Sequence, residues 1–208
     1  MAGKEADVIG GFNSFVTRCR DGSVTNCSVG YIRFDNEIEQ VFTEELANVP
    51  ELTPALYAPR GNTALLDAVG RTVAGVTNNP DDRYIVITFT DGHENASREW
   101  TKEKVAALLK EREALGNWTF AFFGADIDAW AESGGMGYAA GNSMSHDKRR
   151  MRNAMESSGR VAARMAKSDA RSTVHYAAAT KAAMDNPDLS DEEIERLIGG
   201  NAKDAPAT

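Results

Sequence analysis

The chain has 208 residues, of which 42% are hydrophobic, and it carries a formal net charge of -8. This length allows one domain with a substantial core, and the acidic balance argues against general binding to nucleic-acid phosphates, which needs an excess of Lys and Arg. No apolar run is long enough to span a bilayer, and the first residues lack the basic and apolar regions of a secretory signal. We therefore expect a cytoplasmic protein in which Cys19 and Cys27 are buried free thiols.

The first part of the chain predicts a helix followed by a pair of strands. Residues 4–19 place apolar side chains at three- and four-residue steps, which is typical of a helix with one buried face. The segments 24–34 and 37–42 are rich in β-forming residues, and the turn at Asp35 and Asn36 predicts that they pair in antiparallel fashion. Polar residues in the second segment indicate an exposed edge of a sheet.

An irregular, proline-containing loop at 47–62 leads into a second predicted helix. Leu66, Val69 and Val73 follow at helical spacing. Thr63 therefore stands at or just before the N-terminus of this helix.

The stretch from Arg83 to Asn95 is the segment around which we expect the fold to be organised. Its first part, 84–90, has almost no alternation of polar and apolar residues, which predicts an inner strand of a parallel sheet covered by helices on both faces. It ends at Asp91 and Gly92, and an acid followed by glycine at the carboxyl end of a buried strand stands where open α/β sheets place their ligands. The alternative is that Asp91 only starts a turn and caps the next segment.

A second buried strand is predicted at 118–124, and it is again followed closely by an acid, Asp126. Before it, Thr101 is expected to cap a helix that runs to about Leu115. After it, a short helix is expected around 127–132. The alternation of helices and strands predicts an α/β fold with a mostly parallel sheet and right-handed crossovers.

Beyond residue 141 the composition indicates a helical extension. Residues 147–171 predict a long helix with eight basic and three acidic residues. Two interpretations stay open: the basic side chains form a solvated face, or they form a docking face for an acidic partner or a nucleic acid. Residues 186–208 predict a short helix, which begins with a capping box of Ser190 and Glu193, and then a disordered tail. The expected division is 1–141, 142–185 and 186–208.

Three stretches together resemble the von Willebrand factor A family, in its intracellular bacterial and phage branch. They are GNTALLDAVG at 61–70, TFTDGHENAS at 88–97 and AFFGADIDA at 121–129. The resemblance implies a three-layer, Rossmann-like sandwich for residues 1–141, with a mostly parallel sheet, one antiparallel edge strand and helices on both faces. It implies that the following basic helical segment closes the domain.

In this family the implied site is a metal-ion-dependent adhesion site, which usually holds Mg²⁺ above the carboxyl ends of the strands. Thr63 matches the family's threonine ligand and Asp91 matches its aspartate ligand, and oxygen donors of this kind suit Mg²⁺. The implied function is a non-enzymatic protein-interaction module in which another protein donates a carboxylate to the metal.

The family's Asp-x-Ser-x-Ser loop, and the central strand before it, do not occur in this sequence. Met1 matches the methionine that closes this loop in relatives, so we expect an N-terminally incomplete domain in which the strands at 24–34 and 84–90 lack a neighbour. Three explanations are open: a start codon assigned too late, which we favour, a sheet that closes without the strand, or a strand donated by another chain. We expect Thr63 and Asp91 alone to bind Mg²⁺ weakly or not at all, and binding to return when the full motif is added upstream.

Two other functions are alternatives. A nucleic-acid-associated or structural role, for example in a phage, would use the basic helix at 147–171, although we expect neither nucleic acid nor a membrane as a partner. A metal-dependent hydrolase would use His93 and Glu94, but His146 and His175 have no ligand spacing such as HExxH. The chain also has no nucleophile elbow and no Walker loop, so we predict that it is not an enzyme.

Overall fold

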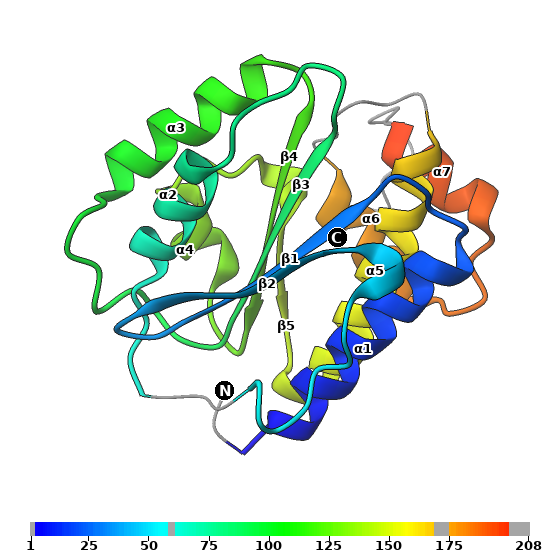
Figure 1. The fold of residues 1–208 in the computed structure, drawn as a ribbon, viewed down its shortest axis with the longest axis horizontal. Coiled ribbons are helices and arrows are strands. Elements are labelled where there is room, and N and C mark those ends of the chain that lie inside the picture. Colours follow the sequence, from blue (N-terminus) through cyan, green and yellow to red (C-terminus); the bar gives the residue numbers. More distant parts are fainter. Residues whose placement is uncertain (1–2, 58–60, 169–174, 200–208) are drawn as a thin grey trace.

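The computed structural model describes residues 3–57, 61–168 and 175–199. These residues form a mixed α/β fold, as the sequence predicts, in which helices flank strands on both sides (Figure 1). The helices are α1 (Glu5–Asp21), α2 (Leu65–Gly75), α3 (Lys102–Ala114), α4 (Ala129–Gly134), α5 (Met151–Lys167), α6 (Tyr176–Asp185) and α7 (Asp191–Gly199). The strands are β1 (Ser28–Phe34), β2 (Ile38–Glu45), β3 (Tyr84–Thr90), β4 (Trp118–Ala125) and β5 (Ser143–His146).

The parallel sheet has the order β3-β4-β5. β3 pairs with β4 from Tyr84 opposite Trp118 to Thr90 opposite Gly124, and every residue of β4 is buried. The two strands predicted at 84–90 and 118–124 are therefore confirmed. The third strand, β5, was not predicted from the sequence, because it has only four residues and two of them are serines.

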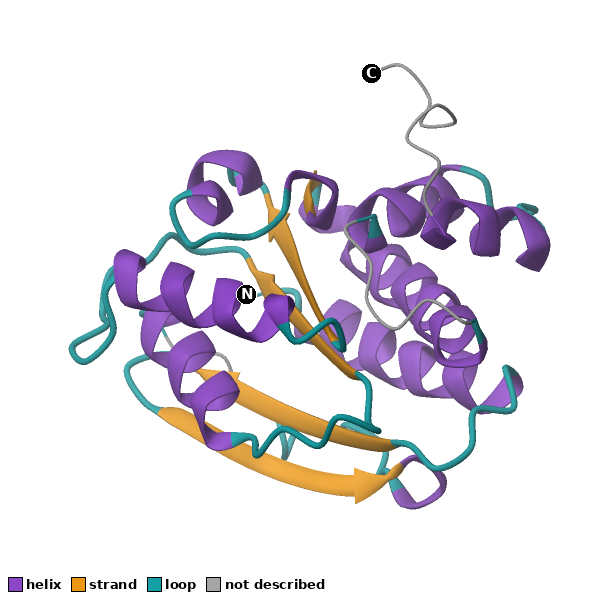
Figure 2. Ribbon diagram, turned by 90° about the horizontal axis from the view of Figure 1, so that it is seen from above, coloured by secondary structure: helices purple, strands orange, loops and turns teal. Residues whose placement is uncertain are grey.

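β1 and β2 form an antiparallel pair, as predicted, with Ser28 opposite Glu45 and Phe34 opposite Ile38. This pair is a separate two-stranded sheet rather than the edge of one continuous sheet. β1 is the strand of the pair that lies toward β3, and the arrows of β1 and β3 point in the same general direction (Figure 2). Within the described residues β1 and β3 do not pair with each other.

Two apolar cores lie on the two faces of the parallel sheet. Successive side chains of a strand point to opposite faces, so Phe120 and Phe122 belong to the core under α2 and α3. Ala121 and Phe123 belong to the core under α1, α5, α6 and α7. Figure 1 shows the two groups of helices on either side of the strands. Burial on both faces explains why the sequence of β4 is apolar at every position except Thr119.

The long basic helix predicted at 147–171 corresponds to α5, which has different bounds and is followed by two further helices. α5 begins at Met151, after a turn of 3-10 helix at Lys148–Arg150, so the predicted start at 147 is four residues early. Residues 169–171 of the predicted helix lie outside the described residues, and so does the tail from 200 to 208. α6 was not singled out from the sequence. One side of α5 is buried, and it includes Met151, Met155, Ser158, Ala162 and Met165.

Two predicted helix caps are present. The Thr101 Oγ1 atom accepts a hydrogen bond from the Lys104 N–H at the start of α3. At the start of α7 the Ser190 N–H donates to Glu193 Oε2 at 2.7 Å, and the Glu193 N–H donates to Ser190 Oγ at 3.2 Å, which is a capping box.

Cys19 and Cys27 are both free thiols. Cys19 is buried, as expected, whereas Cys27 is only half-buried. In the part of the chain that the structure describes, no helix has the length and apolar character needed to cross a membrane.

Gly70 provides a test of how closely α2 packs. A Cβ atom at this position would collide with the indole ring of Trp100. We predict that Gly70→Ala lowers the free energy of unfolding by about 1–3 kcal/mol, because the ring is forced away from α2. Gly75→Ala is the matched control in the same helix, since its Cβ would meet nothing within 4 Å, and it should leave stability unchanged or raise it by about 0.5–1 kcal/mol. Urea unfolding of both variants measures the difference, and equal effects would contradict the packing described.

Candidate functional site at the carboxyl edge of the parallel sheet

The three parallel strands bring two acids and a histidine to one edge of the sheet. Asp91 follows the end of β3, Asp126 follows the end of β4, and His146 is the last residue of β5. This edge is where open α/β sheets usually bind ligands. The sequence predicted the first two positions, but it placed His146 in a helical tail, and this placement was wrong because β5 was not recognised.

Thr63 lies beside the loop that carries Asp91. Its backbone N–H donates to Asn95 Oδ1 at 2.9 Å, and the Asn95 N–H donates to the Thr63 carbonyl at 3.1 Å. A Cβ atom on Gly92 would lie 2.5 Å from Thr63 Oγ1, so the threonine hydroxyl lies directly against the backbone that follows Asp91. The fold therefore brings together the two loops that hold the predicted site residues.

Tyr57 is a neighbour of this site that the sequence did not indicate. The half-buried ring packs beside Val8, Ala125 and Met151. Burial raises the pKa of Tyr57 above its ordinary value, and the nearby charge of Asp91 adds to the shift. The phenol thus stays protonated close to Asp91. Its position in a proline-containing loop gave no periodic pattern from which the contact could be predicted.

The Glu94 carboxylate holds the loop after β3 against the start of α2. It accepts hydrogen bonds from the backbone N–H of Leu66 at 2.9 Å and of Ser97 at 2.8 Å, and from Ser97 Oγ at 2.7 Å. The Glu94 N–H in turn donates to Glu132 Oε1 at 3.1 Å, and His93 Nδ1 lies 3.2 Å from Glu132 Oε2. The two residues considered for a hydrolase are therefore engaged in contacts that shape the loop.

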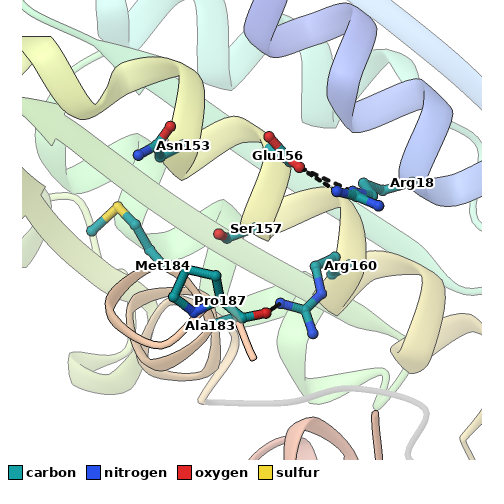
Figure 3. Close-up of a pocket in the computed structure, with 8 residues that line it drawn as sticks. All are labelled: Arg18, Asn153, Glu156, Ser157, Arg160, Ala183, Met184 and Pro187. Atoms are coloured by element: carbon teal, nitrogen blue, oxygen red, sulfur yellow. Dashed lines mark hydrogen bonds and ion pairs between the residues drawn. The ribbon is translucent and has the colours of Figure 1, made fainter. Parts of the chain in front are cut away.

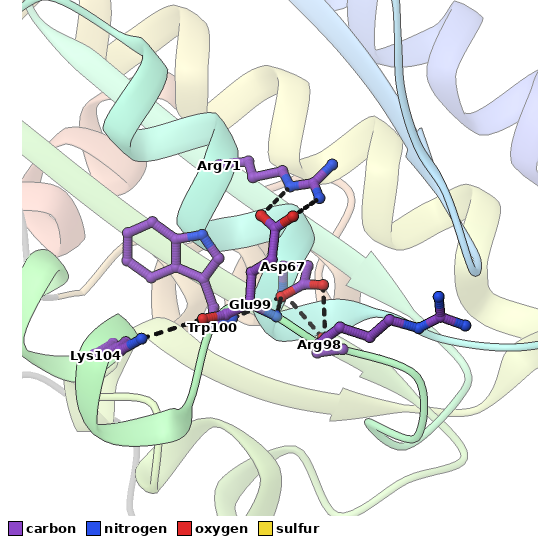
Figure 4. Close-up of polar contacts among 7 residues, drawn as sticks. Asp67, Arg71, Arg98, Glu99, Trp100 and Lys104 are labelled. Atoms are coloured by element: carbon purple, nitrogen blue, oxygen red, sulfur yellow. Dashed lines mark hydrogen bonds and ion pairs between the residues drawn. The ribbon is translucent and has the colours of Figure 1, made fainter.

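Asp67 anchors the other end of the same loop (Figure 4). This side chain of α2 is 4% exposed, and it accepts hydrogen bonds from three consecutive backbone N–H groups, those of Arg98 at 2.8 Å, Glu99 at 3.0 Å and Trp100 at 2.8 Å. Arg71 binds the Glu99 side chain with an Nε to Oε2 distance of 2.9 Å. Although burial acts to raise the pKa of Asp67, the three N–H donors outweigh it, and the pKa is lowered.

His146 is a buried titratable group at this edge, with 7% of its surface exposed. Its Nδ1 atom lies 3.0 Å from the Asp147 carbonyl, and its Nε2 atom has no hydrogen-bond partner among the described residues. Burial lowers the pKa of His146, so the ring is neutral at pH 7. The Asp126 N–H donates to the His146 carbonyl at 2.9 Å, with Asp126 in the left-handed backbone region at a φ of 55°. This bond fixes the ends of β4 and β5 relative to each other.

Two residues of the implied Mg²⁺ site, Thr63 and Asp91, are present in this chain. Thr63 and Asp91 offer two oxygen donors from adjacent loops, whereas Mg²⁺ prefers six ligands in a regular octahedron. Among the residues that the structure places, no group of three or more His, Cys, Asp or Glu residues could hold a metal ion. Weak or absent Mg²⁺ binding by this chain therefore stays a prediction.

Three arginines of the basic segment, one just before α5 and two within it, are bound within the protein. Arg150 Nη2 lies 2.7 Å from Asp185 Oδ1 at the end of α6. Arg160 donates to the carbonyls of Pro187 at 3.1 Å and Leu189 at 2.5 Å. Arg164 forms ion pairs with Asp191 and Glu195 of α7. These contacts attach α6 and α7 to α5, so they support a structural use of the basic residues over a free docking face.

A cavity of about 370 Å³ opens between α1, α5 and the segment that follows α6 (Figure 3). Arg18 and Glu156 pair across it, with Arg18 Nε 3.1 Å from Glu156 Oε1. Arg160 reaches the Pro187 carbonyl on the other side. Because these charged groups are already paired, we assign no ligand to the cavity. Its lining residues are Arg18, Asn153, Glu156, Ser157, Arg160, Ala183, Met184 and Pro187.

No family model, curated protein or solved structure matches the chain. The mixed α/β fold is shown by the structure itself. The resemblance to the von Willebrand factor A family rests on the three sequence motifs alone.

The carboxylates that hold the loop predict how stability depends on pH. The pKa values of Asp67 and Glu94 are both lowered in the folded protein. Their contribution to stability is therefore complete above the ordinary carboxyl pKa of about 4, and it is lost as the pH falls through the lower folded-state values.

Asp67→Asn tests this loop contact directly. At pH 6 we expect the free energy of unfolding to fall by about 1–3 kcal/mol, because buried N–H groups lose a charged acceptor. The difference from the wild type should shrink as the pH is lowered toward 3. Urea unfolding at a series of pH values measures it, with Glu51→Gln, at an exposed position, as the control. A difference that stays constant over this range would contradict the role given to the Asp67 charge.

Proposed function

We propose that this protein is a non-enzymatic protein-interaction module of the von Willebrand factor A type. Its binding face is the edge where β3 and β4 end. The observation that carries the proposal is the contact of the Thr63 hydroxyl with Gly92, directly beside Asp91. This contact supports a binding face in which a hydroxyl and a carboxylate from two adjacent loops act together.

The bonding of the loop favours binding over catalysis. A general base must be within hydrogen-bond reach of the proton that it takes up. The Glu94 carboxylate instead accepts bonds from the N–H groups of Leu66, Ala96 and Ser97, and its pKa is lowered. A low pKa makes a carboxylate a weak base at neutral pH. Hydrogen bonds thus hold the loop in one conformation, which suits a binding surface.

The proposed interaction does not depend on tightly held Mg²⁺ in this chain. Thr63 and Asp91 give two protein donors, and the described residues add no cluster that completes the shell. A protein partner at this edge would contact these two side chains and the backbone of the loops directly.

Paired substitutions test the location of the binding face. We expect Thr63→Val combined with Asp91→Asn to abolish retention of the protein's partner in affinity purification from its native host. The matched control combines Thr77→Val with Asp81→Asn, at exposed positions before the amino end of β3, and it should retain the partner. Equal retention by the two double variants would refute the proposed face, and circular dichroism checks that both are folded.

Calorimetric titration tests the expectation for the metal. Addition of Mg²⁺ to the wild-type protein should give little or no saturable heat, because two donors cannot replace enough of the water bound to the ion. A saturable titration that Asp91→Asn removes would contradict this expectation.

A further inference from the structure

Within the part of the chain that the structure describes, β3 is hydrogen-bonded to a neighbouring strand on one side only. The Tyr84 N–H donates to the Asn117 carbonyl at 2.9 Å, which fixes the residues of β3 whose backbone groups face β4. In a parallel ladder alternate residues bond to the same neighbour, so Val86 and Thr88 also face β4. The N–H and C=O groups of Ile85, Ile87 and Phe89 therefore point to the opposite edge.

β1 has the same arrangement. The Leu46 N–H donates to the Cys27 carbonyl at 2.8 Å, and the Asp35 N–H donates to the Glu37 carbonyl at 3.0 Å, so the odd-numbered residues of β1 face β2. The backbone groups of Gly30 and Ile32 face away from β2. Among the described residues, no hydrogen bond reaches the outward backbone groups of Gly30, Ile32, Ile85, Ile87 or Phe89.

The two free edges belong to strands that face each other. β1 lies on the side of its pair that is nearer to β3 (Figure 2). Phe34 of β1 packs against the same core as Tyr84 and Val86 of β3. On the other face of the sheet, Val29 and Ile85 pack against a common core. We call the region between them the β1–β3 slot, and define it by Gly30, Ile32, Ile85, Ile87 and Phe89.

The side chains around the slot indicate what it would accept. Ile85, Ile87 and Phe89 of β3 are only half-buried, whereas all of β4 is buried. The side chains of β3 reach apolar cores on both faces of the sheet. A strand in the slot would lie between the same two cores, so it would need apolar side chains on both of its faces.

We propose that the β1–β3 slot binds an extended segment of another polypeptide, which pairs with β1 and β3 and joins the two sheets into one. The segment is about as long as β3, which has seven residues, and it is apolar on both faces. Unpaired strand edges template pairing of this kind, in which backbone bonds provide affinity and side-chain pockets provide selectivity. The proposal stands independently of the site at Thr63 and Asp91.

Amide hydrogen exchange tests the free edge before any partner is known. In the isolated protein the amides of Ile85 and Ile87 should exchange faster than those of Val86 and Thr88, because only the latter pair donates to β4. Equal protection of all four amides at low protein concentration would overturn the proposal.

A library of nine-residue peptides displayed on phage supplies the probe. We expect enriched peptides to carry consecutive β-branched and aromatic residues and, once synthesised, to slow exchange at Ile85 and Ile87 at least tenfold. Methylation of two central backbone nitrogens in the peptide should weaken binding about tenfold or more, since each methyl group removes a donor. Absence of enriched peptides, or binding that N-methylation leaves unchanged, would refute the slot.

Substitution of Gly30 tests the β1 side of the slot. Gly30→Pro removes an N–H that has no partner among the described residues, so the hairpin should fold, while peptide binding should weaken about tenfold. Gly30→Ala keeps the N–H and is the matched control. If Gly30→Pro does not fold, the N-methylated peptides decide the question alone.

Two further outcomes separate this proposal from its alternatives. Thr63→Val combined with Asp91→Asn should leave peptide affinity unchanged, so failure of the proposed function would not be mistaken for failure of the slot. Protection of Ile85 and Ile87 that rises with protein concentration, together with a dimer in sedimentation analysis, would show that a second copy fills the slot and would overturn the proposal of a different polypeptide.

Discussion

Two carboxylates bind the backbone N–H groups of the loop after β3, and the shape of the carboxyl edge depends on them. The loop between Asp91 and Trp100 has no helix or strand in which its own N–H groups could pair. Asp67 accepts three of these groups and Glu94 accepts two more. Asp67 is part of α2, and Glu94 also accepts from the Leu66 N–H at the start of α2. The loop and the helix are thus held as one unit, which sets Thr63 beside Gly92.

The sequence predicts those elements whose pattern lies within their own residues, and it does not predict those that depend on contacts with distant residues. β3 and β4 were predicted because a strand covered on both faces has a nearly continuous run of apolar and β-forming residues, which is visible without knowledge of its neighbours. The Ser190 and Glu193 cap was predicted because a capping box is a contact between residues three apart. β5 was missed because its four residues depend on pairing with β4, a contact that its own composition does not reveal.

The same distinction explains what was missed in the site. In the sequence Asp67 is an ordinary polar residue of a predicted helix. Only the fold shows that its carboxylate accepts hydrogen bonds from the three N–H groups of residues 98–100. Thr63 and Asp91 were found through motif spacing, whereas Tyr57 and His146 reach the same region through a loop and a short strand. Local patterns identify elements, but they do not show which side chains of distant elements meet.

The number of basic residues in the segment 147–171 does not show how many of them are free to bind a partner. Its excess of Lys and Arg suggested a surface for an acidic partner, but Arg150, Arg160 and Arg164 bind acids or carbonyls between residues 185 and 195. An arginine that satisfies the carbonyls of a neighbouring connection would have to give up those bonds to bind a phosphate. The charge on α5 is therefore better explained by the attachment of α6 and α7 than by recognition of nucleic acid.

β3 links the two binding features that we propose. Its carboxyl end leads into Asp91, and its outer edge carries the unpaired backbone groups of the β1–β3 slot. β1 and β3 run in the same general direction (Figure 2), so a guest strand parallel to both would end at the same edge of the sheet as Asp91. The residues that follow the guest strand would then leave the slot beside the loops of Thr63 and Asp91. In such a complex, backbone pairing along β3 would hold the guest strand in the slot, while the residues after it would reach the face that we propose for the partner.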